Sequence, residues 1–318
     1  MFDNLARDVF RCWNWPQAED TSFSTIPLPY RISRKLGAPA SSIYLRRDFL
    51  YRGPVRKVIL RPSSRALDLT RYTFAFKLKN DSENALKSML PQFPFIEMIH
   101  TGTLYHTRGQ TGILPGERFC TMDLLEESYE RCSADMRLLE IALWGKGLDK
   151  TPFLPEGEEA PVPALKRDKR DSQILRIMIY KDIREVNVNS IAGATGIPGR
   201  TVRRHLDRFV REMFFSSYVL LMPTNVSNLM TYILSVPNNK KSGISTRDQL
   251  LSLPGVGEKY LLSALTPAGV SVLLYADSFK ELDEVVKPMY DVFHNFSVIV
   301  NCETLLNEAA VGFFTRNV

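Results

Sequence analysis

The chain has 318 residues, of which 44% are hydrophobic and 24% charged, and its formal net charge at pH 7 is +6. This composition is typical of folded chains with buried cores, and the length predicts more than one domain. The apolar runs are too short to span a membrane, and the four cysteines lie far apart with no histidine at metal-ligand spacing. These features argue against a membrane protein, a zinc protein and a disulfide-stabilised protein, so we expect a cytoplasmic protein without a metal site.

The first predicted domain covers residues 1–68 and contains a basic stretch, Arg31–Arg61, in which Asp48 is the only acidic residue. After a long loop at residues 14–29, the apolar spacing predicts a helix, a turn at Gly37 and a second helix. Residues 53–62 are then predicted to form a turn and a strand. Clustered positive charge of this kind is typical of surfaces that contact phosphate.

Residues 69–145 are predicted to form a βαββαβ module, which is ferredoxin-like. Its predicted strands are at 70–80, 93–102, 110–116 and 136–145, and its helices are at 82–90 and 121–132. The third strand has the weakest pattern. A segment rich in Pro, Gly and Glu follows at 146–169, and this composition predicts a linker without a packed core.

The second predicted helical domain covers residues 170–228 and has the clearest pattern. A helix around Ile174–Ile179 is followed by a short helix at 189–195, a turn at Gly196 and a helix that begins near Pro198. The last helix has one apolar stripe and a wet side rich in arginine. Together with a strand at 214–223, this order predicts a winged helix-turn-helix, whose third helix enters the DNA major groove.

Residues 229–318 are predicted to form a second βαββαβ module. Its predicted strands are at 230–239, 256–266, 269–276 and 296–306, and its helices are at 246–253 and 278–293. The stretch 253–265, "LPGVGEKYLLSAL", is similar to the hairpin of helix-hairpin-helix DNA-binding proteins. We interpret Gly255 and Gly257 instead as turn residues, because the matching segment of the first module lacks these glycines.

The two halves of the chain match each other at an offset of about 160 residues. The match aligns Ile32 with Ile191 and Gly37 with Gly196, and it continues through both strands and both modules. The fold class predicted from this repeat is α+β, with a winged helix-turn-helix and a βαββαβ module in each copy.

The candidate DNA-binding residues lie at the front of each arginine-bearing helix, where side chains reach base edges or phosphates. In the second copy they are Arg200, Thr201, Arg203, Arg204 and Arg208. In the first copy they are Ser41, Ser42, Tyr44, Arg46 and Arg47. Lys57 and Arg61 of the first strand are further candidates for contacts with the DNA backbone.

This order of elements resembles the Lrp/AsnC (feast/famine) regulators, in an archaeal-type form duplicated within one chain. The residues that carry the resemblance are "SIAGATGIPGRTVRRHLDRF" and "ISRKLGAPASSIYLRRDFLYRGPV". The resemblance implies a transcriptional regulator that binds double-stranded DNA as a covalent pseudo-dimer. It also implies homo-oligomers through the βαββαβ modules and control by a small-molecule effector, whose binding residues we are unable to map. We expect no catalytic residues and no cofactor.

Two alternatives stay open at this point. Siroheme decarboxylases resemble Lrp/AsnC proteins and bind a tetrapyrrole in the βαββαβ part, where histidine and arginine act on its carboxylates. The chain has His100, His106 and Arg108 in the corresponding region, but it lacks the "HNYxR"-like strand of those enzymes. The second alternative is a scaffold whose winged helices bind other proteins.

Overall fold

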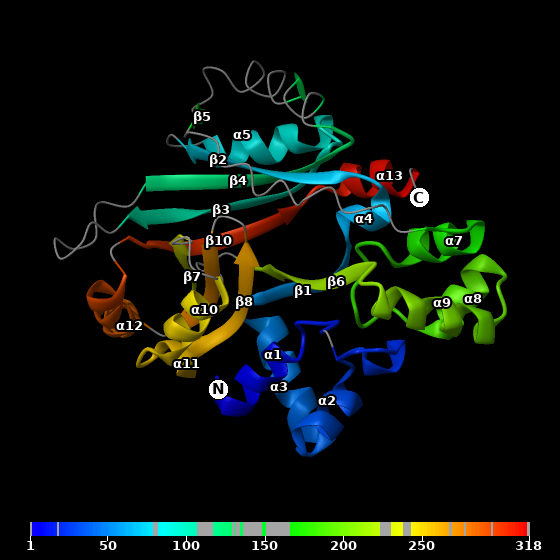
Figure 1. Cartoon of the computed structure of the whole chain (residues 1–318), viewed down its shortest axis with the longest axis horizontal. Helices are drawn as coiled ribbons and strands as arrows, with labels where there is room; N and C mark the ends of the chain where they lie inside the picture. Colours follow the sequence, from blue (N-terminus) through cyan, green and yellow to red (C-terminus); the bar gives the residue numbers. More distant parts are fainter. Residues whose placement is uncertain are drawn as a thin grey trace.

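The structure, a computed structural model, is a mixed α+β protein built on one large and one small antiparallel sheet (Figure 1). It describes the chain except residues 1, 18, 79–81, 107–116, 129–130, 132–133, 136–147, 151–165, 223–229, 238–242, 267–268, 277, 294 and 317–318. In the described part, no helix is both long and apolar enough to cross a membrane.

The first helical unit, residues 2–62, has the predicted order of helix, glycine turn, helix and strand. Its elements are α1 (Asn4–Arg11), η1 (Phe23–Thr25), α2 (Pro29–Leu36), α3 (Ala40–Arg52) and β1 (Val55–Pro62). Gly37 ends α2 in the left-handed conformation, with φ 63°, and its N–H donates to the carbonyl of Ser33. Glycine adopts this conformation without a steric penalty, which explains why the turn lies there.

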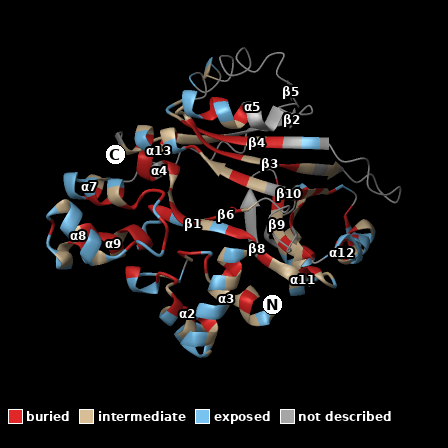
Figure 2. Ribbon diagram, turned by 180° about the vertical axis from the view of Figure 1, so that it is seen from behind, coloured by how far each residue is buried: buried red, intermediate tan, exposed pale blue. Residues whose placement is uncertain are grey.

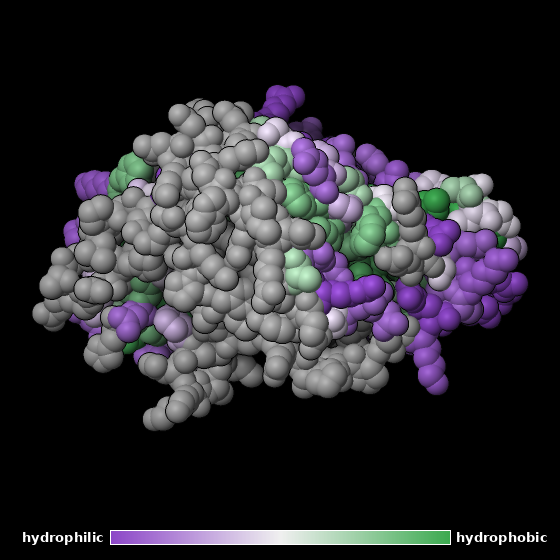
Figure 3. Space-filling view, turned by 90° about the horizontal axis from the view of Figure 1, so that it is seen from above, coloured by the Kyte–Doolittle hydropathy of each residue, from purple (hydrophilic) through white to green (hydrophobic). Residues whose placement is uncertain are grey.

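The second helical unit, residues 168–221, also has the predicted elements, namely α7 (Lys169–Met178), α8 (Val188–Thr195), α9 (Gly199–Arg211) and β6 (Phe215–Leu221). Gly196 closes α8 at φ 69°, as Gly37 closes α2. Buried Val202, Leu206 and Phe209 form the predicted apolar stripe of α9. Figure 3 shows that the end of the molecule carrying α7–α9 is largely hydrophilic on one face.

The strands β1 and β6, expected to be two separate wings, pair with each other as an antiparallel sheet. Val58 lies opposite Val219, and Leu60 lies opposite Ser217. Buried residues from both strands join one hydrophobic core with residues of both helical units. The strands therefore connect the two units, because pairing satisfies their backbone groups and removes their apolar side chains from water.

In the part of the chain that the structure describes, the large sheet has eight strands in the order β5-β2-β4-β3-β10-β7-β9-β8. The strands are β2 (Thr70–Leu78), β3 (Ile96–His106), β4 (Glu117–Glu126), β5 (Leu148–Lys150), β7 (Met230–Pro237), β8 (Tyr260–Thr266), β9 (Gly269–Ala276) and β10 (Ser297–Leu306). The antiparallel pair of β3 with β10 joins a half from residues 70–150 to a half from residues 230–306. Both halves have the same internal strand order.

Helices cover one face of each half of the sheet. On this face lie α5 (Ser82–Met89), η2 (Leu90–Gln92), α10 (Gly243–Ser252), α11 (Val256–Lys259) and α12 (Phe279–Val292). The helices α4 (Ser64–Leu67) and α13 (Glu308–Arg316) instead contribute Ala66, Leu67, Ala310 and Phe314 to the core of the helical units. Leu86 of α5 packs with Ile99 and Met122, and Val285 of α12 belongs to the core of the second half. Figure 2 shows buried residues along β1, β3 and β4, and many exposed ones on α2 and α8.

Some predictions for the first module were wrong. Residues 121–126, expected to begin a helix, are part of β4, which pairs with both β2 and β3. The alternation of buried Cys120, Met122 and Leu124 is that of a strand with one face on a core. β5 lies within the expected linker 146–169. The predicted strands at 110–116 and 136–145 lie outside the described residues. The other two predicted strands of this module are present as β2 and β3.

The stretch 253–265 forms a turn, the short helix α11 and the strand β8. Gly255 has φ 78°, so its interpretation as a turn residue is confirmed, whereas Gly257 lies within α11 and its interpretation was wrong. The segment expected to be a strand from residue 256 begins with one helical turn instead. The helix-hairpin-helix alternative does not fit, because an edge strand of the large sheet follows where a second helix would be needed.

Candidate functional site

The arginines at the front of α9 lie on the surface. Arg200, Arg203 and Arg204 are exposed, and Thr201 is half-buried. Arg208 is different, because its guanidinium forms an ion pair with the fully buried carboxylate of Asp171. The side chain expected to bind phosphate is therefore engaged inside the second helical unit.

The candidate residues of α3 are divided between solvent and ion pairs. Ser41 and Tyr44 are exposed, and Ser42 is half-buried. Arg46 Nη2 lies 2.6 Å from Asp3 Oδ2, and Arg47 Nη2 lies 2.7 Å from Asp48 Oδ1. Arg46 and Arg47 thus have carboxylate partners within the protein.

Arg61, a candidate for DNA backbone contact, is directed away from the surface into a cluster of buried polar groups. Its Nη2 lies 2.6 Å from Glu97 Oε2 and 2.5 Å from Asp123 Oδ2. Arg71 of β2 reaches the same Glu97 carboxylate at 3.0 Å. Tyr180 Oη donates to Glu97 Oε1 at 2.8 Å. We call these five residues the Arg61 cluster. It joins β1 to the large sheet.

Opposite charges control the ionisation of the Arg61 cluster. Burial by itself raises the pKa of Glu97, but Arg61 and Arg71 outweigh it and lower this pKa to about 2. Burial also opposes ionisation of Asp123, and Arg61 and His100 nevertheless hold its pKa well below the ordinary value. Burial and the Glu97 carboxylate raise the pKa of Tyr180 well above its ordinary value. The two carboxylates are therefore ionised and Tyr180 is a neutral donor at pH 7.

His100 and Tyr218 form a pair at the margin of this cluster. His100 Nε2 lies 3.4 Å from Tyr218 Oη and 3.7 Å from Asp123 Oδ2. On the other side of the ring, Nδ1 lies 3.1 Å from Thr304 Oγ1. The His100 side chain retains 19% exposure, so it reaches solvent while hydrogen bonds orient its ring. The side chain of His106, and all of Arg108, lie outside the described residues.

Beside this pair, three neighbouring strands of the second half of the sheet have a face that is only partly covered. In β9, Val270, Val272 and Leu274 are buried against the helices, whereas the alternate residues are half-buried. We call the opposite face the open sheet face. Its half-buried members are Ile233, Ser235, Ser271, Leu273 and Ile299.

The register places the members of the open sheet face next to one another. Ser235 is opposite Ser271, and their hydroxyls are 2.9 Å apart. Ile299 pairs with Ile233 on one side and with Leu104 of β3 on the other. On β3, Ile99 faces the helix-covered core, so its chain neighbour His100 points to the opposite side of the sheet. The open sheet face therefore combines apolar side chains and hydroxyls with the His100–Tyr218 pair near one end.

The sequence indicated one residue of this site and did not indicate the others. His100 was noted as a candidate for tetrapyrrole chemistry, but Tyr218 was read only as part of a wing strand. Asp123 fell in a segment expected to be helical, so its place opposite Met98 on β3 was not foreseen. The alternation of β9 could have indicated a strand with one less buried face. Only the pairing of distant strands brings these residues together.

Comparison with known proteins identifies relatives in fold. No protein-family model matches the chain, and no curated protein sequence matches it. The crystal structure of the siroheme decarboxylase NirDL is similar with a TM-score of 0.53 at 9% identity, covering 99% of this chain and 98% of that chain. The structure of NirDL with an iron-uroporphyrin III analogue is similar with a TM-score of 0.52 at 10% identity, with the same coverage. The chain shares the fold of that protein along its whole length.

These findings overturn the expectation of a DNA-binding transcriptional regulator that is not an enzyme and has no cofactor. Both similar structures are of one enzyme, and one of the two structures holds an iron-uroporphyrin III analogue. The prediction rested on the apolar spacing and the arginines of the helical units, which are local patterns. It failed because the pairing of β1 with β6 and the burial of Arg61 against the sheet are tertiary features that local patterns do not show. DNA contact by the individual α3 and α9 residues stays a prediction.

Proposed function

We propose that the chain is an enzyme that binds a carboxylate-bearing iron tetrapyrrole against the open sheet face and removes carboxyl groups from it as CO2. The observation that carries this proposal is the likeness in fold to the siroheme decarboxylase NirDL over nearly the full length of both chains. The described residues supply a site whose chemistry fits such a substrate, as follows.

The open sheet face suits a flat macrocycle. Pocket walls for planar cofactors are mostly apolar with a few placed polar groups. Ile233 and Ile299 supply apolar contact area beside Leu273, which also packs against the core of the helical units. The paired hydroxyls of Ser235 and Ser271 supply polar groups on the same surface. Because these side chains are half-buried, a bound ring would remove further apolar area from water, which favours binding.

The His100–Tyr218 pair suits the reacting end of the substrate. When a carboxylate leaves as CO2, the electron pair of the broken carbon–carbon bond stays on the substrate carbon, and that carbon must then receive a proton. A histidine or tyrosine within reach is a suitable donor. His100 and Tyr218 are the groups we assign to this step, and Thr304 orients the His100 ring through its hydrogen bond to Nδ1.

The Arg61 cluster positions this pair and does not bind substrate in the proposal. Arg61 and Arg71 are each already paired with Glu97. Asp123, which Arg61 keeps ionised, lies 3.7 Å from His100 Nε2 and faces the imidazole with a negative charge. The cluster therefore places a negative charge beside the ring of His100.

We also infer that the architecture is a tandem Lrp/AsnC-like repeat. The inferred parts are winged helix-turn-helix domains at 1–68 and 170–228, ferredoxin-like modules at 69–145 and 229–318, and a linker at 146–169, of which β5 belongs to the first module. Support comes from the strand orders β5-β2-β4-β3 and β10-β7-β9-β8, which are the same in both halves. Each half has the order expected when the four strands of a βαββαβ unit form one antiparallel sheet.

The experiment that tests the function has a binding part and a catalytic part. Purified protein is titrated with iron uroporphyrin III while the visible absorbance spectrum is followed, and CO2 release is then measured with siroheme. We expect saturable binding near one ligand per chain and release of CO2. Absence of both saturable binding and CO2 release would overturn the proposal.

Substitutions then locate the site. His100→Ala and Tyr218→Phe should each lower the rate of CO2 release by about 100-fold or more, the usual contribution of a proton donor. Tyr105→Phe is the matched control, because Tyr105 lies in the same strand and packs against the helix-covered core instead. Equal rates for all three variants and the unchanged protein would contradict the assignment of His100 and Tyr218.

A further inference from the structure

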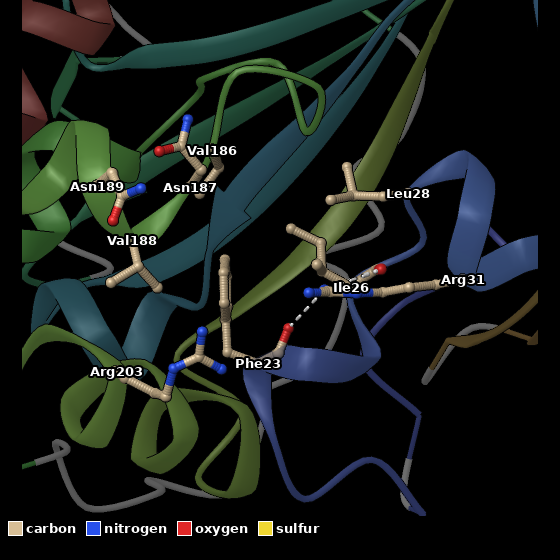
Figure 4. Close-up of a pocket in the computed structure, with 9 residues that line it drawn as sticks. All are labelled: Phe23, Ile26, Leu28, Arg31, Val186, Asn187, Val188, Asn189 and Arg203. Carbon is tan, nitrogen blue, oxygen red and sulfur yellow. Dashed lines mark hydrogen bonds between the residues drawn. The ribbon is translucent and has the colours of Figure 1, made fainter. Parts of the chain in front are cut away.

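A cavity lies between the two helical units, away from the large sheet. Its volume is about 200 Å³, below the 300 Å³ at which pockets for drug-sized ligands begin. Residues of η1, α2, α8 and α9, and of the segments beside them, form its wall (Figure 4). Its arginines are Arg31 of the first helical unit and Arg203 of the second.

The long loop of the first unit closes this cavity by binding to α9. The N–H of Phe23 donates to Asp207 Oδ1 at 2.8 Å, and the hydroxyl of Ser22 donates to the same oxygen at 2.9 Å. Asp207 is the only acidic residue between Gly196 and Arg211. The carboxylate of Asp207 thus accepts hydrogen bonds from the loop. Among the described residues, it forms no ion pair with an arginine of α9.

Two guanidinium groups with no carboxylate partner converge on the cavity. Among the residues that the structure describes, no carboxylate oxygen lies within 4.0 Å of Arg31 or Arg203. Figure 4 shows these two side chains reaching toward Phe23 from different elements. Arg31 donates to the carbonyls of Phe23 and Ile26 at 3.2 and 3.4 Å, which fixes its position. A guanidinium has five N–H donors, so further donors remain for a ligand.

Beside the two arginines, the wall combines apolar side chains with the polar start of α8. Phe23, Ile26 and Val186 are buried side chains of this wall. Val188 is the first residue of α8, and Asn187 caps that helix through its side chain. The first N–H groups of a helix carry partial positive charge, which adds to the attraction for an anion.

We propose that this cavity binds a small organic carboxylate with an apolar body, held by Arg31 and Arg203 on its carboxylate and by the Phe23 side of the wall on its apolar part. Planar guanidinium groups match the geometry of a carboxylate. The small volume limits the body to about one ring or a short branched chain. Such a ligand would link the two helical units, because Arg31 comes from the first and Arg203 from the second.

The test uses benzoate as the probe and benzamide as its uncharged counterpart of the same shape. Binding to the full chain is followed by saturation-transfer NMR. We expect saturable binding of benzoate and at least tenfold weaker binding of benzamide. Arg203→Met and Arg31→Met should each weaken benzoate binding by about tenfold or more.

Arg204→Met is the matched control, because Arg204 is an exposed arginine one residue further along α9 that does not line the cavity. It should leave benzoate binding within twofold. Equal loss in the Arg203 and Arg204 variants, or no saturable binding, would overturn the proposal. Tighter binding of phenyl phosphate than of benzoate would overturn the assignment to carboxylates. Iron uroporphyrin binding should be unchanged in Arg203→Met, which separates this site from the proposed active site.

Discussion

The helices α3 and α9 follow the same kind of turn but use their charges differently. Each comes after a left-handed glycine, Gly37 or Gly196, and each begins directly after a proline. In α3, Arg46 pairs with Asp3. In α9, the arginines at the front of the helix are exposed. The buried ion pair of this helix is made further along, by Arg208 with Asp171.

The two units also place their buried charges in different parts of the fold. The first unit sends Arg61 from its strand β1 to Glu97 of the large sheet. The second unit keeps its buried charge between two of its own helices, where Asp171 contacts His205 at 2.6 Å and pairs with Arg208. The difference teaches that one backbone pattern can place its buried charge either against a neighbouring sheet or between its own helices.

Asp168, Asp171 and His205 of the second unit are residue types that can bind a metal ion. Ligand atoms of Asp168, Asp171 and His205 lie within 4.8 Å of one another. Arg208, however, already supplies a positive charge to Asp171, and Asp168 caps α7. This arrangement holds α7 against α9 as an ion-pair network.

Loss of the anchor of the first unit should have the largest effect on stability. Glu97→Gln leaves Arg61 and Arg71 buried with less compensating charge, which costs about 3–5 kcal/mol when a buried pair is broken. The free energy of unfolding in urea measures this effect. Glu212→Gln, which removes an exposed carboxylate from the end of α9, is the control and should change stability by less than about 1 kcal/mol. Similar losses in both variants would contradict the contrast between the units.

Acid should weaken the same anchor. The pKa of Glu97 is about 2 in the folded chain and 4.5 as its ordinary value. A carboxylate with a lowered pKa contributes stability above its unfolded pKa, and the contribution is lost as the pH falls toward the folded pKa. We expect a loss on the order of 3 kcal/mol between pH 5 and pH 2 from this group. The melting temperature should depend less steeply on pH in Glu97→Gln than in the unchanged protein. An equally steep dependence in both would argue against the role of Glu97.

Loss of the internal anchor of the second unit should have a smaller effect. Asp171→Ala removes charged hydrogen bonds to His205 and Arg208, and the expected cost is about 2 kcal/mol because Arg208 can regain water. Hydrogen exchange should rise in α7 and α9 and stay unchanged in α3. Equal increases in both units would show that the network does not act locally.

Substitution of the shared turns should have the smallest effect, equal in both units. Ala at position 37 or 196 would meet no atom within 4 Å, so only the left-handed backbone opposes it. Gly37→Ala and Gly196→Ala should each cost about 1 kcal/mol. Urea unfolding of the two variants measures the costs, and a difference above about 1 kcal/mol would mean that one turn has a further role.

The sequence alone determined much of the local structure. Apolar spacing predicted α7 and α9, and the paired Gly37 and Gly196 revealed that the turn occurs twice. The alternation in residues 269–276 predicted β9. These predictions succeeded because periodicity, glycine conformation and helix capping depend on residues within a few positions of one another.

Tertiary structure decided the charges and the site. The sequence shows that Arg46, Arg61 and Arg203 are arginines in basic stretches, but only the fold turns the first toward Asp3, the second into the sheet and the third toward a cavity. His100 likewise meets Tyr218 across 118 positions of sequence. Electrostatic and hydrogen-bond partners are chosen by distance in space, and strand pairing between the two halves of the chain sets those distances.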